Sequence, residues 1–285
     1  MLLDTSSTQV FYAFLITLWA GLSTGIGSAL IFFTKRTNRI FLSVSLGFSA
    51  GVMVYVSFVE LFRSAETTMT PLYGERLATL YATLAFFAGV ALIGIIDRLI
   101  PEAENPHELP DQSAVRSLQN ESAQTTTAHE QSLLRTGMVT AIVLAIHNFP
   151  EGMVTFMSAL TDLSLALPIA IAIALHNIPE GISVAIPIYH ATGNKRKAFF
   201  LSLSSGLAEP IGGLLGFLLL RPFLTPTVMG CCFAMIAGIM VYISFDELLP
   251  AAERFGHHHT ALYGLIGGMA FMALSLLLLE LLAVS

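Results

Sequence analysis

Two six-residue segments with the pattern His-Asn-X-Pro-Glu-Gly hold the residues most able to do chemistry in this sequence. They run from His147 to Gly152 and from His176 to Gly181, each inside an apolar stretch long enough to cross a bilayer. An ionisable side chain at that depth is energetically costly and therefore indicates a functional site. Imidazole and carboxylate groups together favour Zn²⁺ and other first-row divalent ions. The repeated spacing predicts a metal site inside a membrane protein.

The geometry of an α-helix places the histidine and the glutamate of each motif on one face. His147 lies four residues before Glu151, and His176 lies four residues before Glu180. Two such helices facing each other would offer two imidazoles, two carboxylates and two amides. The two carboxylates would also balance both charges of a divalent ion, which lowers the cost of burying that ion. A single His-Glu pair could be a structural salt bridge, but its repetition in adjacent spans argues for ligands.

The other residues of each motif shape the helix around these groups. Asn148 and Asn177 follow the histidines and point about 100° round the helix, toward a neighbouring face. The proline of each motif cannot donate a backbone hydrogen bond, so it kinks the helix and frees a carbonyl of the preceding turn. The closing glycine permits a close approach between helices.

Two further residues could complete the site. Glu209 precedes Pro210 and carries the only charge of its apolar stretch, so it is either a ligand or a cap of a neighbouring helix. Met53 lies at core depth and is either a thioether ligand or a packing residue. Met240 stands at the matching place in another apolar stretch, and a ligand role for Met53 would require the same of it.

Three acidic residues lie nearer the ends of their apolar stretches. Glu60 could draw cations in from one side, and Asp246 with Glu247 could pass them on at the other. Asp246 and Glu247 could equally be solvated carboxylates at helix ends. The cluster at 257–259 consists of three histidines, which either bind metal weakly or form an incidental loop.

The composition predicts an all-α polytopic membrane protein. The 285 residues are 55% hydrophobic and only 11% charged, with a mean hydropathy of +0.76, whereas soluble proteins have about a quarter of their residues charged. About twenty apolar residues span the hydrocarbon core. Eight spans are expected, at Val10–Phe33, Phe41–Phe62, Leu77–Ile100, Gly137–Leu160, Leu165–Tyr189, Ala198–Leu220, Thr227–Leu249 and Leu262–Val284.

The distribution of basic residues predicts the orientation of these spans. Of the 13 lysines and arginines, ten fall in the loops after the odd-numbered spans and three on the other side. Basic loops stay in the cytoplasm, so both termini are expected outside. The whole chain, 1–285, forms one transmembrane domain, in which the polar segment 101–136 is expected to be a flexible cytoplasmic loop.

An internal repeat runs through the chain. Ala50–Leu61 in the second span matches Ala237–Leu248 in the seventh, and Gly21-Leu22 with Ile26-Gly27 matches Gly206-Leu207 with Ile211-Gly212. Spans one to three are thus expected to repeat as six to eight, and span four as five. Each pair is separated by an odd number of crossings, so the copies have inverted topology, which is typical of transporters with a midplane site. Drift among small and aliphatic residues is the alternative explanation.

The paired HNxPEG motifs, the Glu-Pro of the sixth span and the eight spans resemble the ZIP family of divalent-metal transporters, specifically its bacterial zinc-uptake branch. The resemblance implies a 3+2+3 arrangement of helices, a homodimer and a place in the bacterial inner membrane. It assigns a first metal site to His147, Glu151, His176, Glu180 and Met53. A second site falls to Asn148, Asn177 and Glu209, bridged by Glu151 and Glu180. Asp246 and Glu247 resemble an inward exit pair. Some relatives carry Gln-Asp where this chain has His176-Asn177, which here leaves the second site one carboxylate fewer.

The function implied is the import of Zn²⁺ and related ions such as Fe²⁺, Mn²⁺, Co²⁺ and Cd²⁺ into the cytoplasm, without a resident cofactor. A divalent-metal channel would use the same ligands and stays an alternative. An intramembrane metalloenzyme is disfavoured because the HExxH motif of zinc proteases is absent. The chain has no nucleotide-binding P-loop, and its net charge of -6 does not favour nucleic acid. The lipid bilayer and the metal ions are the expected partners.

Overall fold

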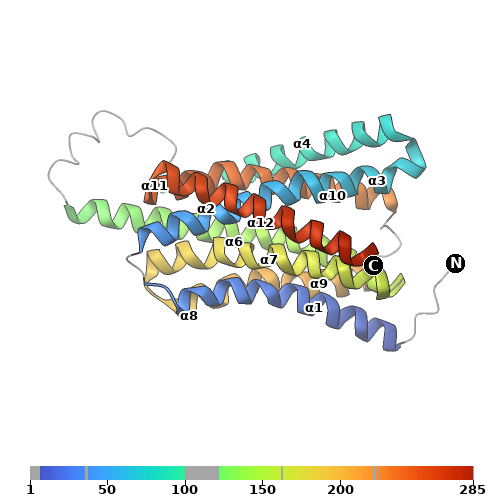
Figure 1. Ribbon diagram of the computed structural model, residues 1–285, viewed down its shortest axis with the longest axis horizontal. Coiled ribbons are helices and arrows are strands. Elements are labelled where there is room, and N and C mark those ends of the chain that lie inside the picture. The colour runs from blue at the N-terminus through green and yellow to red at the C-terminus, as the bar shows by residue number, and fades with distance from the viewer. Residues whose placement is uncertain are drawn as a thin grey trace.

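The computed structural model describes residues 7–35, 38–99, 122–161, 163–220, 223 and 225–284, and across these residues the chain is helical with no strand. The helices run roughly along one axis and form an elongated bundle (Figure 1). The α-helices are α1 (Ser7–Ala29), α2 (Arg39–Val56), α3 (Phe62–Tyr73), α4 (Glu75–Leu99), α6 (Ser122–Thr161), α7 (Leu163–Thr192), α8 (Lys195–Gly206), α9 (Ala208–Leu215), α10 (Pro226–Ile243), α11 (Leu249–Phe255) and α12 (His258–Val284).

Seven helical segments of the described chain are long and apolar enough to cross a membrane. They are Ser7–Phe32, Arg39–Tyr73, Glu75–Ile95, Leu133–Met157, Lys195–Leu219, Pro226–Arg254 and His258–Leu279. The expectation of an all-helical polytopic membrane protein is therefore confirmed. Helix α7, which has 30 residues and carries the second motif, is not among these seven segments.

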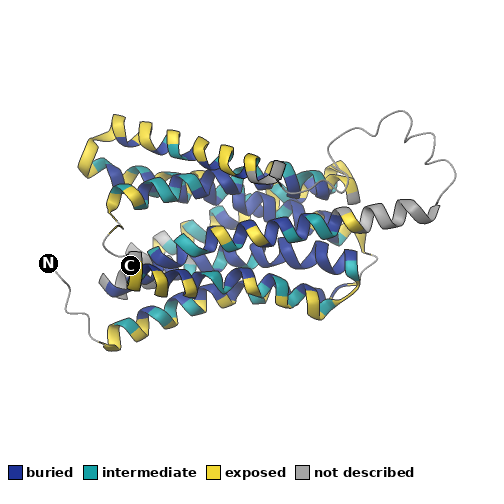
Figure 2. Cartoon of the chain, turned by 180° about the vertical axis from the view of Figure 1, so that it is seen from behind, coloured by how far each residue is buried: buried dark blue, intermediate teal, exposed yellow. Residues whose placement is uncertain are grey.

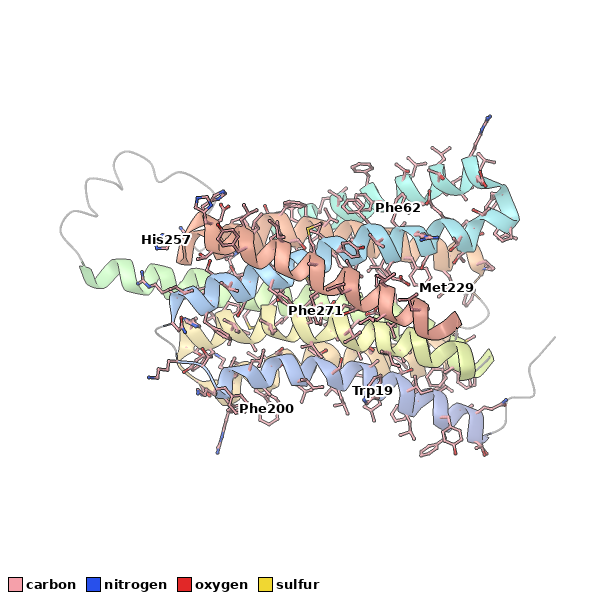
Figure 3. All side chains as sticks on the ribbon, in the orientation of Figure 1. Trp19, Phe62, Phe200, Met229, His257 and Phe271 are labelled. Atoms are coloured by element: carbon pink, nitrogen blue, oxygen red, sulfur yellow. The ribbon has the colours of Figure 1, made fainter. Side chains whose placement is uncertain are left out.

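The burial pattern separates the interior of the bundle from its outer face. Buried residues follow the central helices, and exposed residues follow the outer sides of α1 and α4 (Figure 2). Large apolar side chains such as Trp19 and Phe200 project outward (Figure 3), where they are 51% and 65% exposed. Polar side chains such as Thr17, Ser49 and Ser202 are instead fully buried. An apolar exterior with polar side chains gathered inside, among a hydrophobic core, suits a protein surrounded by lipid.

Two helices contain a π-helical turn at matching places in their sequences. Residues Ser57–Leu61 form η2 between α2 and α3, and Ser244–Leu248 form η6 between α10 and α11. In both, the first serine donates a hydrogen bond to a methionine carbonyl one turn earlier, at 2.7 Å from Ser57 to Met53 and from Ser244 to Met240. A π-turn widens the helix and re-aims the side chains that follow. A third π-turn, η4 (Gly216–Leu220), follows α9.

Helix packing brings together elements distant in sequence. Helix α2 packs against α12 and α7, α4 packs against α10, α1 packs against α7, and α9 packs against α6. The two motif helices, α6 and α7, also pack directly against each other along the centre of the bundle (Figure 1). The two copies of the motif are therefore held side by side.

Two helices extend beyond the expected spans. Helix α6 begins at Ser122, so residues 122–136, expected as flexible loop, are helical instead. No glycine or proline occurs from Asp111 to Thr136, and the alanine, glutamine, glutamate and leucine residues there favour helix. Residues 101–121 of the expected loop lie outside the described residues. The helix of the second span does not end at Phe62, because η2 and α3 continue it to Tyr73.

Candidate metal-binding site

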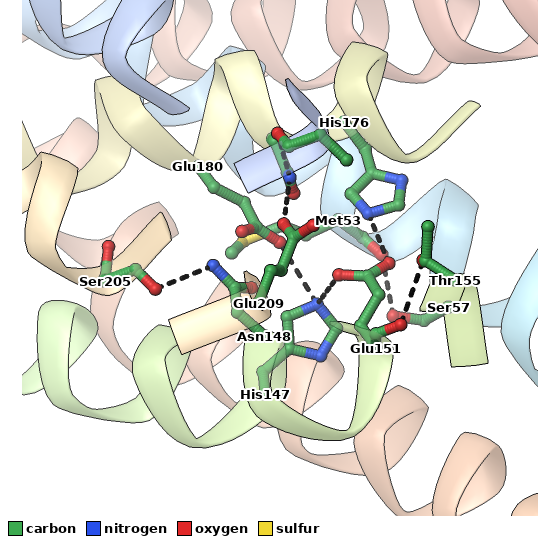
Figure 4. Close-up of polar contacts among 12 residues, drawn as sticks. Met53, Ser57, His147, Asn148, Glu151, Thr155, His176, Glu180, Ser205 and Glu209 are labelled. Atoms are coloured by element: carbon green, nitrogen blue, oxygen red, sulfur yellow. Dashed lines mark hydrogen bonds and ion pairs between the residues drawn. The ribbon is translucent and has the colours of Figure 1, made fainter. Parts of the chain in front are cut away.

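The histidines and glutamates of the two motifs meet where α6 and α7 pack together (Figure 4). His147 Nε2 lies 3.4 Å from Glu151 Oε2 on its own helix and 3.2 Å from Glu180 Oε1 on α7. His176 Nε2 lies 2.7 Å from Glu151 Oε1 on α6. The shorter contacts thus run between the helices rather than along one of them. The two motifs form one shared cluster.

The cluster is almost completely removed from solvent. His147, Glu151, His176 and Glu180 are each at most 4% exposed. One ligand atom from each of His147, His176 and Glu180 lies within 4.8 Å of the other two. Three donors so close together can reach one ion at once, and their mixture of imidazole and carboxylate suits Zn²⁺.

Several buried oxygens of the cluster have no hydrogen-bond partner among the described residues. They are Glu180 Oε2, Glu209 Oε2, Asn148 Oδ1 and Asn177 Oδ1, whereas Glu151 Oε2 and Glu180 Oε1 have only their ion-pair contacts with His147. Buried polar atoms are nearly always paired, so a group of unpaired acceptors indicates a missing positive partner. A divalent cation would satisfy several of them together.

The two asparagines are anchored through their amide nitrogens. Asn148 Nδ2 donates to the backbone oxygen of Ser205 at 3.1 Å, and Asn177 Nδ2 donates to that of Ala20 at 3.0 Å. Asn177 Nδ2 also donates to Glu209 Oε1. Because the nitrogens are engaged in this way, the amide oxygens remain available as ligands. Glu209, fully buried on α9, is joined to the second motif through Asn177.

The closing glycine of each motif lets a third helix approach. A Cβ atom on Gly152 would lie 1.9 Å from the backbone oxygen of Glu209. A Cβ atom on Gly181 would lie 2.0 Å from that of Thr24. Both distances are far shorter than any real carbon–oxygen contact, so only glycine fits. This packing holds α9 against α6 and α1 against α7, as the motif predicts.

Comparisons with known proteins show the family of this chain. The model of the family described as ZIP zinc transporter matches residues 101–276. A protein named zinc transporter ZupT from Streptococcus mutans is 55% identical over 272 residues, which cover 95% of this chain and 99% of that protein. The proteins of the same name from Clostridium perfringens and Nitratidesulfovibrio vulgaris are 52% and 53% identical, covering 95% of this chain and 96% and 98% of theirs. The chain belongs to the ZIP zinc transporter family. The relatives are named as transporters, in agreement with the expectation that this chain is not an enzyme.

In this ZIP chain, α2 brings Met53 to the edge of the cluster (Figure 4). The residue is fully buried. Ser49, one turn earlier, donates to the backbone oxygen of Pro179 at 2.7 Å and so joins α2 to the second motif. Met240, the sequence counterpart of Met53, is also fully buried, on α10.

The three acidic residues expected along the path of the ion belong to the two π-turns. Glu60 belongs to η2, is partly buried and lies within electrostatic range of His176. Asp246 and Glu247 belong to η6, where Glu247 is 7% exposed and both residues have interaction partners. Because η2 leads into α3 and η6 into α11, the two π-turns face opposite ends of the bundle (Figure 1).

The histidine cluster at 257–259 is not part of the central site. It lies at the end of the bundle where α11 meets α12 (Figure 3). There His258 Nδ1 lies 2.7 Å from Glu253 Oε1, and both side chains are well exposed.

Sequence reasoning overlooked the groups that α1 and α8 contribute to this ZIP site. The carbonyl oxygens of Ala20 and Ser205 orient the two asparagines, and Thr24 lies against Gly181. Backbone oxygens leave no signal in a sequence. The internal repeat was the available clue, because it aligns Ala20 with Ser205.

Proposed function

We propose that this chain is a transporter that imports Zn²⁺ and related divalent metal ions through the cluster between α6 and α7. The observation that carries the proposal is the crossed arrangement of His147 with Glu180 and of His176 with Glu151, at 3.2 and 2.7 Å. Membership of the ZIP family supports the same function. The relatives are bacterial and the helices are long enough to cross a membrane, so we place the chain in the inner membrane.

The proposed architecture has eight spans in a 3+2+3 arrangement. Helix α7 is added to the seven segments given above and is the fifth span along the chain. At about 1.5 Å per residue, the 30 residues of α7 exceed the length needed to cross the hydrocarbon core. The start of α1 and the end of α12 lie at the same end of the bundle (Figure 1), which supports an even number of crossings. With the basic loops in the cytoplasm, both termini are outside.

Helix packing supports the proposed inverted repeat. The contact between α2 and α12 has its counterpart in the contact between α10 and α4, and the contact between α1 and α7 has its counterpart between α9 and α6. Both π-turns also fall at equivalent positions, in η2 and η6. A site between inverted halves can be opened to either side of the membrane by moving one bundle against the other. Dimerisation, implied by the family, is part of the proposal but not needed for the site.

We assign the ligands in two groups. His147, His176, Glu151, Glu180 and Met53 hold the first ion. Asn148, Asn177 and Glu209 hold an adjoining second ion, with the two motif glutamates as bridges. The unpaired amide and carboxylate oxygens support the second group.

The proposed route passes the two π-turns. Glu60 attracts ions on the outer side, and its carboxylate interacts electrostatically with His176 of the first group. Asp246 and Glu247 receive ions on the cytoplasmic side. Carboxylates at both ends would raise the local concentration of cations along the path.

Uptake of Zn²⁺ into proteoliposomes tests the function. Glu151→Ala and His176→Ala should each abolish saturable uptake, because each removes a group from the shared cluster. His258→Ala provides the matched control, since it removes an exposed histidine outside the cluster, and it should transport like the unmodified chain. Unchanged uptake by Glu151→Ala or His176→Ala would refute the proposal.

The same preparation separates a carrier from a channel. A carrier must change conformation for each ion, so its uptake saturates at modest rates and competing ions lower it. Uptake should be measured with Zn²⁺, Fe²⁺, Mn²⁺, Co²⁺ and Cd²⁺ in competition, under imposed pH and voltage gradients. Non-saturating flux far above carrier rates would instead favour the channel.

A further inference from the structure

Thr24 on α1 is a buried hydroxyl that has no hydrogen-bond partner. Its exposure is 0%, and no group of the described chain bonds to Oγ1. Nearby hydroxyls on the same helix behave differently, because Thr17 and Ser28 each donate to the carbonyl four residues earlier, at 2.9 and 2.8 Å. The carbonyl that Thr24 would use in that way, Ala20, already accepts from Asn177 and Ser23. The Thr24 hydroxyl is therefore free for a ligand.

The position of Thr24 connects both halves of the metal site. Its backbone oxygen contacts Gly181 of the second motif, where a Cβ atom would lie 2.0 Å away. Its Oγ1 would lie 2.6 Å from a Cβ atom on Gly206. Gly206 directly follows Ser205, whose carbonyl anchors the Asn148 amide. The free hydroxyl thus lies against Gly206, the residue next to the Ser205 carbonyl that holds Asn148, and Asn148 Oδ1 is also unpaired.

The internal repeat aligns Thr24 with Glu209. Thr24 lies three residues after Gly21, as Glu209 lies three residues after Gly206, so the two are counterparts. On one side, Asn177 bonds to the Ala20 carbonyl and to the carboxylate of Glu209. On the other side, Asn148 bonds to the Ser205 carbonyl, and Thr24 stands where a second Glu209 would be.

We propose that Thr24 Oγ1 is an oxygen ligand, which together with Asn148 Oδ1 forms a neutral subsite for the transported ion or a water bound to it. The inference rests on the proposed function and adds a specificity-determining residue to it. Neutral oxygens suit ions such as Mn²⁺ more than Zn²⁺, which prefers nitrogen and sulfur. The subsite therefore extends the range of the transporter toward oxygen-preferring divalent ions.

Two substitutions separate the hydroxyl from the shape of the side chain. Thr24→Val keeps the branched shape without the oxygen, and Thr24→Ser keeps the oxygen. In proteoliposomes, Thr24→Val should raise the KM for Mn²⁺ about tenfold, in the range found when groups supporting a metal site are removed, and that for Zn²⁺ much less. Thr24→Ser should keep the KM for Mn²⁺ close to that of the unmodified chain. Equal KM values for Thr24→Val and the unmodified chain with both ions would overturn the inference, as would a Thr24→Ser variant no better than Thr24→Val.

Thermal unfolding without metal gives a second readout. Because Oγ1 has no protein partner to lose, the midpoint of Thr24→Val should equal or exceed that of the unmodified chain. Added Mn²⁺ should stabilise Thr24→Val less than the unmodified chain, since ligands stabilise the state that binds them. A lower midpoint without metal would mean that the hydroxyl has a structural partner and would overturn the inference.

The two proposals can fail separately. If Glu151→Ala abolishes uptake while Thr24→Val changes no KM, only the role of Thr24 is lost. If Glu151→Ala transports normally, the proposed function itself fails.

Discussion

The motif on α6 and the motif on α7 differ only at Phe149 and Ile178, yet they occupy unequal surroundings. Glu151 contacts both histidines, at 3.4 and 2.7 Å, whereas both oxygens of Glu180 are without a hydrogen bond and its one close histidine is His147. Each motif also has a different neighbouring helix, α9 against Gly152 and α1 against Gly181. Equal sequences therefore do not imply equal roles in the site.

The largest difference should appear between the two glutamates. Glu151→Gln should lower Zn²⁺ uptake by at least about 100-fold, since it removes the charge that both histidines face. Glu180→Gln should also impair uptake, but less, because His147 keeps its contact with Glu151. Initial rates in proteoliposomes would measure both. Equal losses would show that the unequal contacts have no functional weight.

A smaller difference is expected between the asparagines. Asn177→Ala should lower uptake about tenfold, because it removes an amide ligand and also leaves the buried Glu209 without its hydrogen bond. Asn148→Ala should have a weaker effect, since Asn148 Nδ2 holds a backbone carbonyl rather than a carboxylate. The ratio of the two KM values is the measurement. A larger loss in Asn148→Ala would show that Asn148, and not Asn177, contributes more to the site.

The methionines of the repeated spans offer a third comparison. Met53→Leu should lower Zn²⁺ affinity a few-fold, by about 1 kcal/mol or less, because it removes one thioether and keeps the packing volume. Met240→Leu on α10 tests whether the sequence counterpart shares this role, and it should bind Zn²⁺ like the unmodified chain if Met53 alone is a ligand. Isothermal titration in detergent would compare them. Equal affinities would assign Met53 to packing alone.

The smallest effect is expected at the spacer between asparagine and proline. Exchanging Phe149→Ile and Ile178→Phe makes each motif copy the other, and both side chains are only partly buried. Uptake should change by less than about twofold, because neither side chain carries a ligand group and hydrophobic exchanges that keep the total volume are well tolerated. A large change would mean that the spacers, rather than α1 and α9, cause the inequality of the motifs.

The helical membrane architecture and most of the cluster could be predicted from the sequence. On a helix, histidine and glutamate four residues apart share one face. An uninterrupted stretch of about twenty apolar residues favours a helix in the bilayer, because a helix bonds its backbone groups within the segment. Helix ends were harder to predict. The second span continues to Tyr73 and α6 begins at Ser122, since polar helix formers extend a helix beyond the membrane without any apolar signal.

The sequence by itself determined the residue types, their spacing and the apolar stretches that contain them, because those depend on local geometry and hydrophobicity. Only the tertiary structure decided which partners meet. Local spacing favours His176 with Glu180, but the packing of α7 on α6 brings His176 to Glu151 instead, at 2.7 Å. Likewise, nothing local distinguishes Thr24 from its hydroxyl neighbours on α1. The close approach of α1 to Gly181 and Gly206, which only assembled helices create, places its free hydroxyl against Gly206, next to the residue that anchors Asn148.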